Sequence, residues 1–243
     1  MTKKIDAIFL DTGNTLRVVS KDAIFQNHAQ QEIVKLLGVN ENAAAYCRRL
    51  GDRYRAYKNW TKQTLVEPSE VELWTRWMLP DSPAEKIAPI ASKLTRLWIN
   101  QNGRRVPRPD VRQTLIELDK RGYALGIIAN SISTTEIPEW LEKDGLAQYF
   151  KCVMLSAEFG HRKPDPSIFI EAARMVGAEP AKCAYVGDNP SRDIEGTHRA
   201  GFGMAVILLE SDTLAKEPPK GRERPDAIIR ECKDLLNIFQ PRS

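Results

Sequence analysis

Short apolar runs alternate with helical patterns along most of the chain. Residues 5–10 form the first apolar run, and the polar stretch Asp-Thr-Gly-Asn-Thr follows directly, which predicts a buried strand that ends in a tight loop. Beyond residue 106 this alternation continues, and a parallel sheet with right-handed crossovers and helices on both faces is expected. The expected helices are 110–121, 136–144, 166–176, 191–200 and 231–239, and the expected strands are 124–128, 152–155, 183–186, 204–209 and 226–229, with a polar, proline-rich loop over 210–225.

The stretch between the first strand and this alternating region has helical periodicity only. Apolar residues recur at the spacing of one helical face from Ile24 to Leu37, and again from Val71 to Met78. Because the first strand belongs to the sheet, this helical block is an insertion. The predicted fold class is therefore α/β, a Rossmann-like parallel sheet core with helices on both faces and an inserted all-helical cap. We expect cap helices over 22–37, 42–58, 69–78 and 83–99, a cap of residues 17–106, and a core of residues 1–16 and 107–243.

Composition and charge narrow the class of protein. The 243 residues are 28% charged and 42% hydrophobic, as in an ordinary folded soluble protein. The formal net charge of +4 is mild and no long basic run concentrates it, so we expect no nucleic-acid partner. No apolar run reaches membrane-spanning length, no signal peptide is recognisable, and four scattered cysteines without a CxxC pair indicate reduced thiols. We therefore expect a cytoplasmic protein that contacts no membrane, as a monomer or a homodimer.

Polar side chains gather at four predicted strand ends. In an open parallel sheet these ends converge on one crevice, so residues far apart in sequence can share a site. Taken singly, Asp11 or Asp188 could simply belong to a turn, and Lys163 could be a solvated surface charge. Taken together and in this order, the segments favour an active site. They are Asp11 to Thr15, Ala129 to Ser131, Lys163 to Pro166, and Gly187-Asp188 with Asp193.

These segments resemble the motifs of the haloacid dehalogenase-like superfamily, especially the branch with a helical cap inserted after the first strand. In that family the first strand ends in Asp-x-Asp-x-Thr, and the second motif is Ser or Thr, commonly followed by Asn. A lysine in a Lys-Pro-Asp-Pro context comes third, and Gly-Asp with a downstream acid comes last. The resemblance covers the whole chain and implies a Mg²⁺-dependent phosphohydrolase of a small phosphorylated metabolite, with an aspartyl-phosphate intermediate at Asp11.

The resemblance also assigns roles to residues, and each role has a physical basis. A carboxylate can attack phosphorus only if the repulsion between anions is screened, as Mg²⁺ held by oxygen ligands does. A lysine stabilises charge that spreads over the phosphoryl oxygens, backbone N–H groups bind phosphate, and a threonine braces the first loop. The candidate residues are Asp11 and Lys163 for catalysis, Thr15, Ala129, Asn130 and Lys163 for the phosphate, and Asp11, the Gly13 carbonyl, Asp188 and, through water, Asp193 for the metal.

Two positions depart from the family pattern. Gly13 stands where the family has its general acid and base, and Ala129 stands where it has Ser or Thr. Loss of a positioned acid costs about 10²–10⁴ in rate. The absent hydroxyl removes a charge-assisted hydrogen bond of about 1.5–3 kcal/mol. Turnover of ordinary esters should be slow, whereas an acyl phosphate, whose carboxylate leaves without a proton, should suffer least.

Two alternatives to this hydrolase function remain. The substitutions at Gly13 and Ala129 also fit a catalytically impaired protein that only binds phospholigands. Phosphonoacetaldehyde hydrolase, a related family member, likewise lacks the acid and recruits a cap lysine as a Schiff base, which directs attention to Lys58 and Lys62. Dehalogenation is disfavoured, because the Ser-Asn-Gly pattern typical of those members is absent around Asn130.

The cap is expected to act as a lid that excludes water and reads the substrate. Its tryptophans, Trp60, Trp74, Trp77 and Trp98, are expected mainly in the cap's own core, although one or two could line the cleft. The three histidines show no metal-ligand spacing, and His161 is the one nearest the predicted site.

Overall fold

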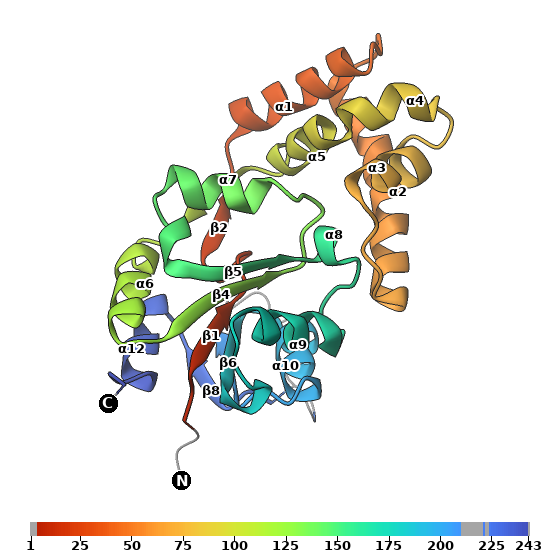
Figure 1. The fold of residues 1–243 in the computed structure, drawn as a ribbon. Coiled ribbons are helices and arrows are strands. Elements are labelled where there is room, and N and C mark those ends of the chain that lie inside the picture. The colour runs from red at the N-terminus through yellow and green to blue at the C-terminus, as the bar shows by residue number, and fades with distance from the viewer. Residues whose placement is uncertain (1–3, 210–220, 222–223, 243) are drawn as a thin grey trace.

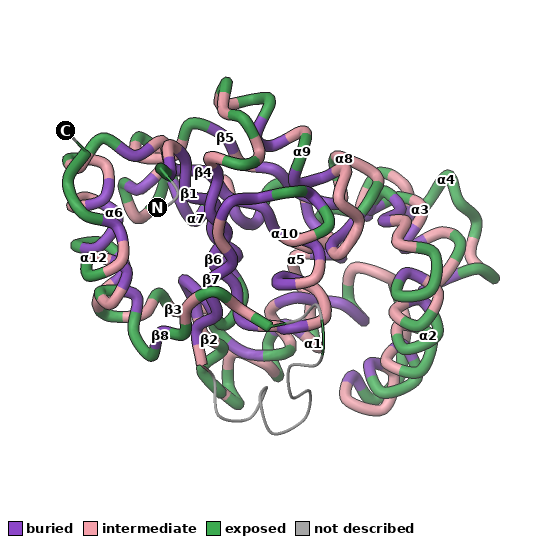
Figure 2. Tube along the Cα trace, turned by 90° about the horizontal axis from the view of Figure 1, so that it is seen from below, coloured by how far each residue is buried: buried purple, intermediate pink, exposed green. Residues whose placement is uncertain are grey.

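The computed structural model describes residues 4–209, 221 and 224–242. The expected loop over 210–225 therefore lies almost entirely outside the described residues. Within them, the chain forms a sheet covered on both faces and a separate helical layer (Figure 1). The buried residues concentrate in the strands of the sheet, whereas helix α2 (Ala43–Thr64) is exposed along much of its length (Figure 2).

The sheet has six strands in the order β5-β4-β1-β6-β7-β8, and every neighbouring pair is parallel. The predicted α/β fold class is thereby confirmed. Strand β1 is central, and Leu10 at its carboxyl end is in register with Ile127 and Val186 of the two neighbouring strands. Ligands bind at such a point, where the chain connections diverge to opposite sides. The strands are β1 (Ala7–Leu10), β4 (Ala124–Ala129), β5 (Phe150–Leu155), β6 (Cys183–Gly187), β7 (Met204–Leu208) and β8 (Ala227–Ile229).

Two hydrophobic clusters fill the space between the sheet and its helices. Helices α6, α7 and α12 contribute to one cluster, together with strand residues such as Leu125 and Val186. Helix α9 packs on the opposite face, where Phe169 contacts Tyr185, and the loop after α10 adds Phe202. The core helices are α6 (Val111–Lys120), α7 (Glu136–Lys143), η3 (Ala147–Tyr149), α8 (Ser156–Phe159), α9 (Pro166–Met175), η4 (Pro180–Lys182), η5 (Pro190–Ile194), α10 (Glu195–Arg199), η7 (Cys232–Asp234) and α12 (Leu235–Ile238).

The inserted block is helical, as expected, and has its own hydrophobic core. Trp74 and Trp98 are buried in that core and contact each other edge to face, which confirms the structural role expected for most of the cap tryptophans. The segment expected as one helix over 83–99 is divided near Pro89, because proline supplies no N–H for the helical ladder. The cap helices are α1 (Ala23–Leu36), α2, α3 (Glu70–Glu72), η1 (Leu73–Met78), α4 (Ala84–Ile87), η2 (Ala88–Ile90) and α5 (Ala91–Asn100).

Two features of the insertion differ from expectation. Helix α2 does not stop near residue 58 but continues to Thr64, since Thr61 in its last turns is buried and accepts a hydrogen bond from Arg162 of the core. The two connections to the cap also form an unexpected antiparallel ribbon of strands β2 (Arg17–Ser20) and β3 (Arg104–Pro107). Each strand has only four residues and little alternation of polarity, which gives no period-2 signal.

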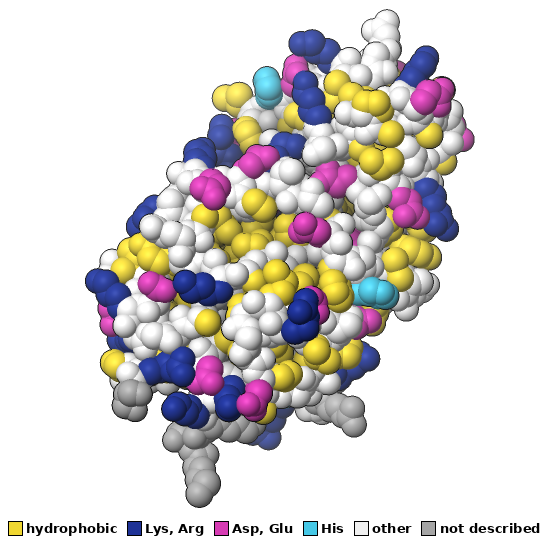
Figure 3. Space-filling view, viewed as in Figure 1, with side chains coloured by type: hydrophobic (Ala, Val, Ile, Leu, Met, Phe, Trp, Pro, Cys, Tyr) yellow, Lys and Arg dark blue, Asp and Glu magenta, His cyan; other side chains and the backbone are white. Residues whose placement is uncertain are grey.

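The surface carries charges of both signs. On the face seen in Figure 3, Lys and Arg side chains are interspersed with Asp and Glu over both the cap and the core. No helix in the described ranges combines the length and the hydropathy needed to span a membrane.

Candidate active site

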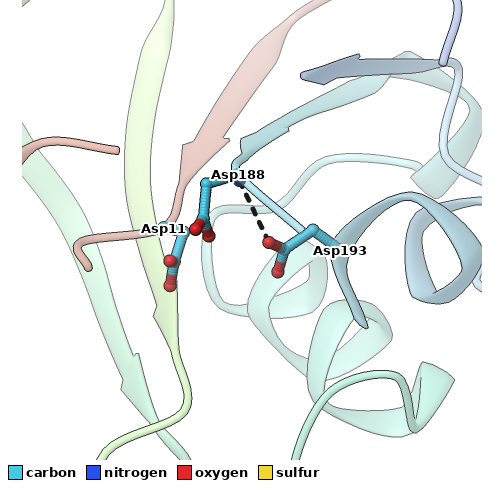
Figure 4. Close-up of side chains that lie close together, drawn as sticks. All are labelled: Asp11, Asp188 and Asp193. Carbon is cyan, nitrogen blue, oxygen red and sulfur yellow. Dashed lines mark hydrogen bonds between the residues drawn. The ribbon is translucent and has the colours of Figure 1, made fainter. Parts of the chain in front are cut away.

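Three buried carboxylates meet at the carboxyl ends of strands β1 and β6. Asp11 directly follows β1 and donates its backbone N–H to the carbonyl of Val186 on β6, at 2.9 Å. Asp188 directly follows β6, and Asp193 lies in the helical turn after it. Carboxylate oxygens of the three residues lie within 4.8 Å of one another (Figure 4). Adjacent parallel strands thus bring together acids that are far apart in sequence.

Lys163 connects two of these carboxylates. Its Nζ lies 2.9 Å from Oδ1 of Asp11 and 2.8 Å from Oδ1 of Asp193, and its side chain is fully buried. The ammonium also contacts the hydroxyl of Tyr185, which donates to the carbonyl of Ile128 at 2.9 Å. A buried lysine is tolerated only when it is paired, and this one has two carboxylate partners. The structure therefore places four of the sequence-predicted residues in one cluster.

Asp193 holds this cluster in position. Its Oδ2 accepts the backbone N–H groups of Asp188 at 3.2 Å and of Asn189 at 3.0 Å, while its Oδ1 pairs with Lys163. Burial alone would raise the pKa of Asp193, but the Lys163 ammonium and the Arg192 guanidinium hold that pKa below its usual value. A side chain at Gly187 would place its Cβ 2.5 Å from the Asp193 carboxylate, so glycine is required there.

Asp188 lies close enough to Asp193 for their negative charges to repel each other. Burial and the nearby Asp193 charge raise the pKa of Asp188 to about 6. Its Oδ1 accepts from Nη2 of Arg192 at 2.9 Å, and its Oδ2 accepts from Nδ2 of Asn14 at 3.1 Å. Hard oxygen donors that repel one another are the donor set that a divalent cation such as Mg²⁺ stabilises, so these residues fit that metal.

Arg192 and Asn14 were not predicted from the sequence. Arg192 lies four residues after Asp188, a spacing that could have indicated an ion pair across one helical turn. Asn14 adopts a left-handed conformation, with φ of 55°, which suits asparagine and turns its amide toward Asp188. Asn14 belongs to the segment Asp11 to Thr15, which was predicted to contribute to the site, whereas Arg192 lies outside the predicted segments, just before Asp193.

The loop after β4 anchors the lysine segment. Oδ1 of Asn130 accepts the backbone N–H of Lys163 at 2.8 Å, and its Nδ2 donates to the Lys163 carbonyl at 3.0 Å. The Ala129 side chain is instead buried in the sheet core, and Thr15 has a buried Oγ1 with no hydrogen-bond partner among the described residues. Arg108 braces the first loop through the Thr15 carbonyl. The phosphate-binding roles of Ala129, Asn130 and Thr15 stay predictions.

A cavity of about 270 Å³ separates this cluster from the cap. Asp11, Gly13 and Asn130 line it from the core, whereas Lys58 and Trp98 line it from the cap. Trp98 therefore belongs to the cap core and to the cavity wall, as allowed for one or two tryptophans. A side chain at Gly13 would meet no heavy atom within 4 Å of its Cβ, so the missing acid leaves open space beside Asp11.

The two candidate cap lysines, Lys58 and Lys62, occupy different positions. Lys58 is half-buried in the cavity wall, and burial together with the neighbouring Arg162 charge lowers the pKa of its amine to about 8. Lys62 is exposed and does not line the cavity at Asp11. His161 is also absent from the wall, and its Nδ1 lies 3.8 Å from Asp165. Of these three residues, only Lys58 faces the space in front of Asp11.

Glu67 joins the cap to the core beside the site, and no motif or spacing in the sequence pointed to this residue. Its carboxylate accepts hydrogen bonds from Tyr57 of α2 and, at 2.9 Å, from Ser156 of the core, and it pairs with Arg162 at 3.2 Å. Ser156 Oγ also accepts the backbone N–H of Ser131, at 2.9 Å. The end of α2 is therefore tied to the two loops that carry Ser131 and Lys163.

Comparison with known proteins agrees with this geometry. A family model described as haloacid dehalogenase-like hydrolase matches residues 14–207. The chain belongs to this family. Among solved structures, this haloacid dehalogenase-like hydrolase is similar to a 2-haloacid dehalogenase from Pseudomonas syringae, at 22% identity and a TM-score of 0.69, covering 96% of this chain and 97% of the other. A phosphatase of the family from Thermococcus onnurineus is 20% identical, with a TM-score of 0.62 and coverage of 98% and 99%. These likenesses show the shared fold.

Curated relatives match part of this hydrolase more closely. A glyceraldehyde 3-phosphate phosphatase from Methanopyrus kandleri is 36% identical over 136 residues, which cover 55% of this chain and 57% of the relative. A phosphoserine phosphatase from Thermus thermophilus is 35% identical over 146 residues, covering 60% of this chain and 56% of the relative. The chain thus spans a little over half the length of the curated relatives it matches.

Proposed function

We propose that this haloacid dehalogenase-like hydrolase is a Mg²⁺-dependent phosphatase of a small phosphorylated metabolite, with Asp11 as the nucleophile. The observation that carries the proposal is the buried Lys163 ammonium between Asp11 and Asp193, with Asp188 beside them. The names of the partly matching relatives, which are phosphatases of small metabolites, support the same reaction class.

Each residue has a distinct task in this reaction. A carboxylate oxygen of Asp11 forms a bond to phosphorus while the ester oxygen leaves, and water later hydrolyses the aspartyl-phosphate. Lys163 holds Asp11 in place and stabilises the negative charge on the phosphoryl oxygens. Asp11, Asp188 and the Gly13 carbonyl would hold Mg²⁺, with Asp193 acting through water. When bound, the cation screens the repulsion between the carboxylate and the phosphate.

The open space at Gly13 shapes the choice of substrate. No acid stands beside Asp11 at that position. A leaving group that needs a proton therefore departs about 10²–10⁴ times more slowly than in an enzyme that has the acid. Acyl phosphates avoid this loss. We therefore expect them to be hydrolysed faster than alkyl phosphates of similar size.

A phosphatase screen with and without Mg²⁺ tests the proposal. The panel contains sugar phosphates, acyl phosphates and phosphonates, and phosphate release is measured for the wild type and for Asp11→Asn. We expect Mg²⁺-dependent release that falls by about 10³-fold or more in Asp11→Asn, whereas Asp52→Asn, on the exposed side of the cap, keeps wild-type activity. Release that survives Asp11→Asn would end the proposed mechanism. Tight phospholigand binding without any turnover would favour the binding protein instead.

The position of Lys58 supports a second candidate, a phosphonatase-like hydrolase. This amine lines the cavity with Asp11, and its pKa of about 8 leaves a neutral fraction that can form a Schiff base. Borohydride reduction in the presence of phosphonoacetaldehyde tests it by mass spectrometry. Labelling that persists in Lys62→Met and disappears in Lys58→Met would support this chemistry, and absence of labelling in the wild type would exclude it.

A further inference from the structure

The cavity in front of Asp11 carries an excess of positive side chains. Its wall includes five cations, which are Arg17, Lys58, Arg105, Arg162 and Arg192. Three of these are already paired with carboxylates. Arg17 binds Glu136 through two hydrogen bonds of 2.7 and 2.9 Å, Arg162 lies 3.2 Å from Glu67, and Arg192 lies 2.9 Å from Asp188.

Lys58 and Arg105 remain without such a partner. Among the described residues, neither forms an ion pair within 4.0 Å. The guanidinium of Arg105 lies near Glu136, which Arg17 already binds with both of its oxygens, and it donates to the carbonyl of Ile99 at 3.5 Å. Lys58 comes from α2 of the cap and faces Arg162, Arg192 and the carboxylate of Glu67, which Arg162 already binds.

Charge balance indicates what a ligand must supply. The three carboxylates of the metal site carry as much negative charge as Lys163 and one divalent cation carry positive charge. Asp188, the partner of Arg192, is already counted among these three carboxylates. The wall therefore holds the five cations against two further carboxylates, Glu67 and Glu136, which leaves a surplus of three positive charges. The dianion of a phosphate monoester neutralises two of these charges. One positive charge in the half-buried wall would then stay uncompensated, which is unfavourable because the cavity removes part of its hydration.

We propose that the substrate is a phosphate ester that also bears a carboxylate, and that Lys58 of the cap receives this carboxylate while Asp11 attacks the phosphate. This inference rests on the proposed phosphatase function and narrows its substrate class. A carboxylate matches a surplus of one charge, whereas a second phosphate would exceed it. Lys58 is the better of the two unpaired cations for this contact, because Arg105 is held close to the Arg17–Glu136 pair.

The protonation of Lys58 agrees with this role. With a pKa of about 8, about nine-tenths of the amine carries its charge at pH 7, and a bound carboxylate stabilises the charged form further. The cavity volume of about 270 Å³ suits a compact ligand in which the phosphate and the carboxylate lie only a few bonds apart.

Calorimetric binding of two matched, non-ester probes tests the inference without requiring turnover. Phosphonoacetate is ethylphosphonate with a carboxylate in place of the methyl group, so only the first probe carries a second anion. With Mg²⁺ present, we expect the wild type to bind phosphonoacetate at least tenfold more tightly than ethylphosphonate. Lys58→Met and Lys58→Gln should reduce this ratio about tenfold, and Lys58→Arg should retain it. Lys62→Met and Arg104→Met, on neighbouring residues outside the cavity wall, serve as matched controls.

Each other outcome contradicts a defined part of the inference. A ratio near one in the wild type would exclude a second anion site. A ratio that survives Lys58→Met but disappears in Arg105→Met would remove Lys58 as the receiving group. Failure of the phosphatase proposal gives a different result, because the probes can show the preference even when no ester in the panel is hydrolysed. Conversely, phosphate esters without a carboxylate can be hydrolysed even when the ratio is one.

Discussion

Nζ of Lys163 lies 2.9 Å from Oδ1 of Asp11, although 152 residues separate them in the sequence. The contact is fixed from behind, because Asp193 accepts the same ammonium at 2.8 Å and uses its other oxygen for two backbone N–H groups. Asp193 is therefore best understood as the residue that positions Lys163 toward Asp11. Phosphoryl transfer depends on charged groups that are held in position before the reaction begins, so this rigidity favours catalysis.

Removal of the Lys163 charge should destabilise the fold as well as the site. In Lys163→Met, the carboxylates of Asp11 and Asp193 lose their shared cation inside the core, and such uncompensated burial costs about 3–5 kcal/mol. Urea denaturation should show this loss, with phosphate release abolished in parallel. Lys182→Met, which removes an exposed partner of Glu179, is the control and should leave the unfolding midpoint unchanged. A loss below about 1 kcal/mol in Lys163→Met would contradict the assigned pairing.

Magnesium should stabilise the wild type and should fail to stabilise Asp188→Asn. Lys163 and Arg192 pair with the three carboxylates, yet burial and the Asp193 charge still raise the pKa of Asp188, so without a metal ion the neutral amide should raise the melting temperature in EDTA. The wild type should gain about 2.7 kcal/mol at a Mg²⁺ concentration one hundred times its Kd, a gain that Asp188→Asn loses. Thermal denaturation with EDTA and with Mg²⁺ measures both effects. Equal stabilisation of the two proteins by Mg²⁺ would place the metal elsewhere.

The sequence was most informative where local pattern and topology agree. The strand ends at Asp11 and Asp188 were predictable because a short apolar run followed by polar turn residues predicts a strand and its exit, and parallel pairing then brings such exits together. The helical cap was predictable from its periodicity. Trp74 was correctly assigned to the cap core, since helical spacing places it on the face shared with other apolar residues.

Contacts that depend on how the cap meets the core were not predictable. Glu67 looks like an ordinary surface acid in the sequence, yet it is 3% exposed and joins Tyr57, Ser156 and Arg162. The Arg17–Glu136 pair is similar, because its two members come from the linker ribbon and from α7. In both cases the partners have no characteristic spacing in the sequence, so only the three-dimensional arrangement identifies these contacts.

Restoring the acid at position 13 should accelerate the hydrolysis of alkyl phosphates. No heavy atom lies within 4 Å of a Cβ placed at Gly13, and its backbone is not left-handed, so Gly13→Asp fits without strain. We expect kcat for alkyl phosphates to rise by about 10²–10⁴, with little change for acyl phosphates, whose leaving group needs no proton. Gly13→Asn is the control, because asparagine has nearly the same shape as aspartate but has no carboxyl proton to give to the leaving group. A gain of the same size in Gly13→Asn, or for both substrate classes, would show that general acid catalysis is not what the site lacks.

Preference for a carboxylate-bearing ligand should decline as the pH rises above about 8. The charged groups that face Lys58 are Arg162, Glu67, Arg192 and Lys62, and with burial they give its amine a pKa of about 8. Because the protonated form receives the carboxylate, the affinity ratio of phosphonoacetate to ethylphosphonate should be constant below that pH and should fall by up to about tenfold per unit above it. Titration of the phosphonate group affects both probes and largely cancels in the ratio.

Lys58→Arg keeps its charge over this range, so its ratio should stay level between pH 7 and about 9.5. The same decline in Lys58→Arg would mean that another group controls the preference, and a level wild-type ratio would mean that Lys58 does not receive the anion.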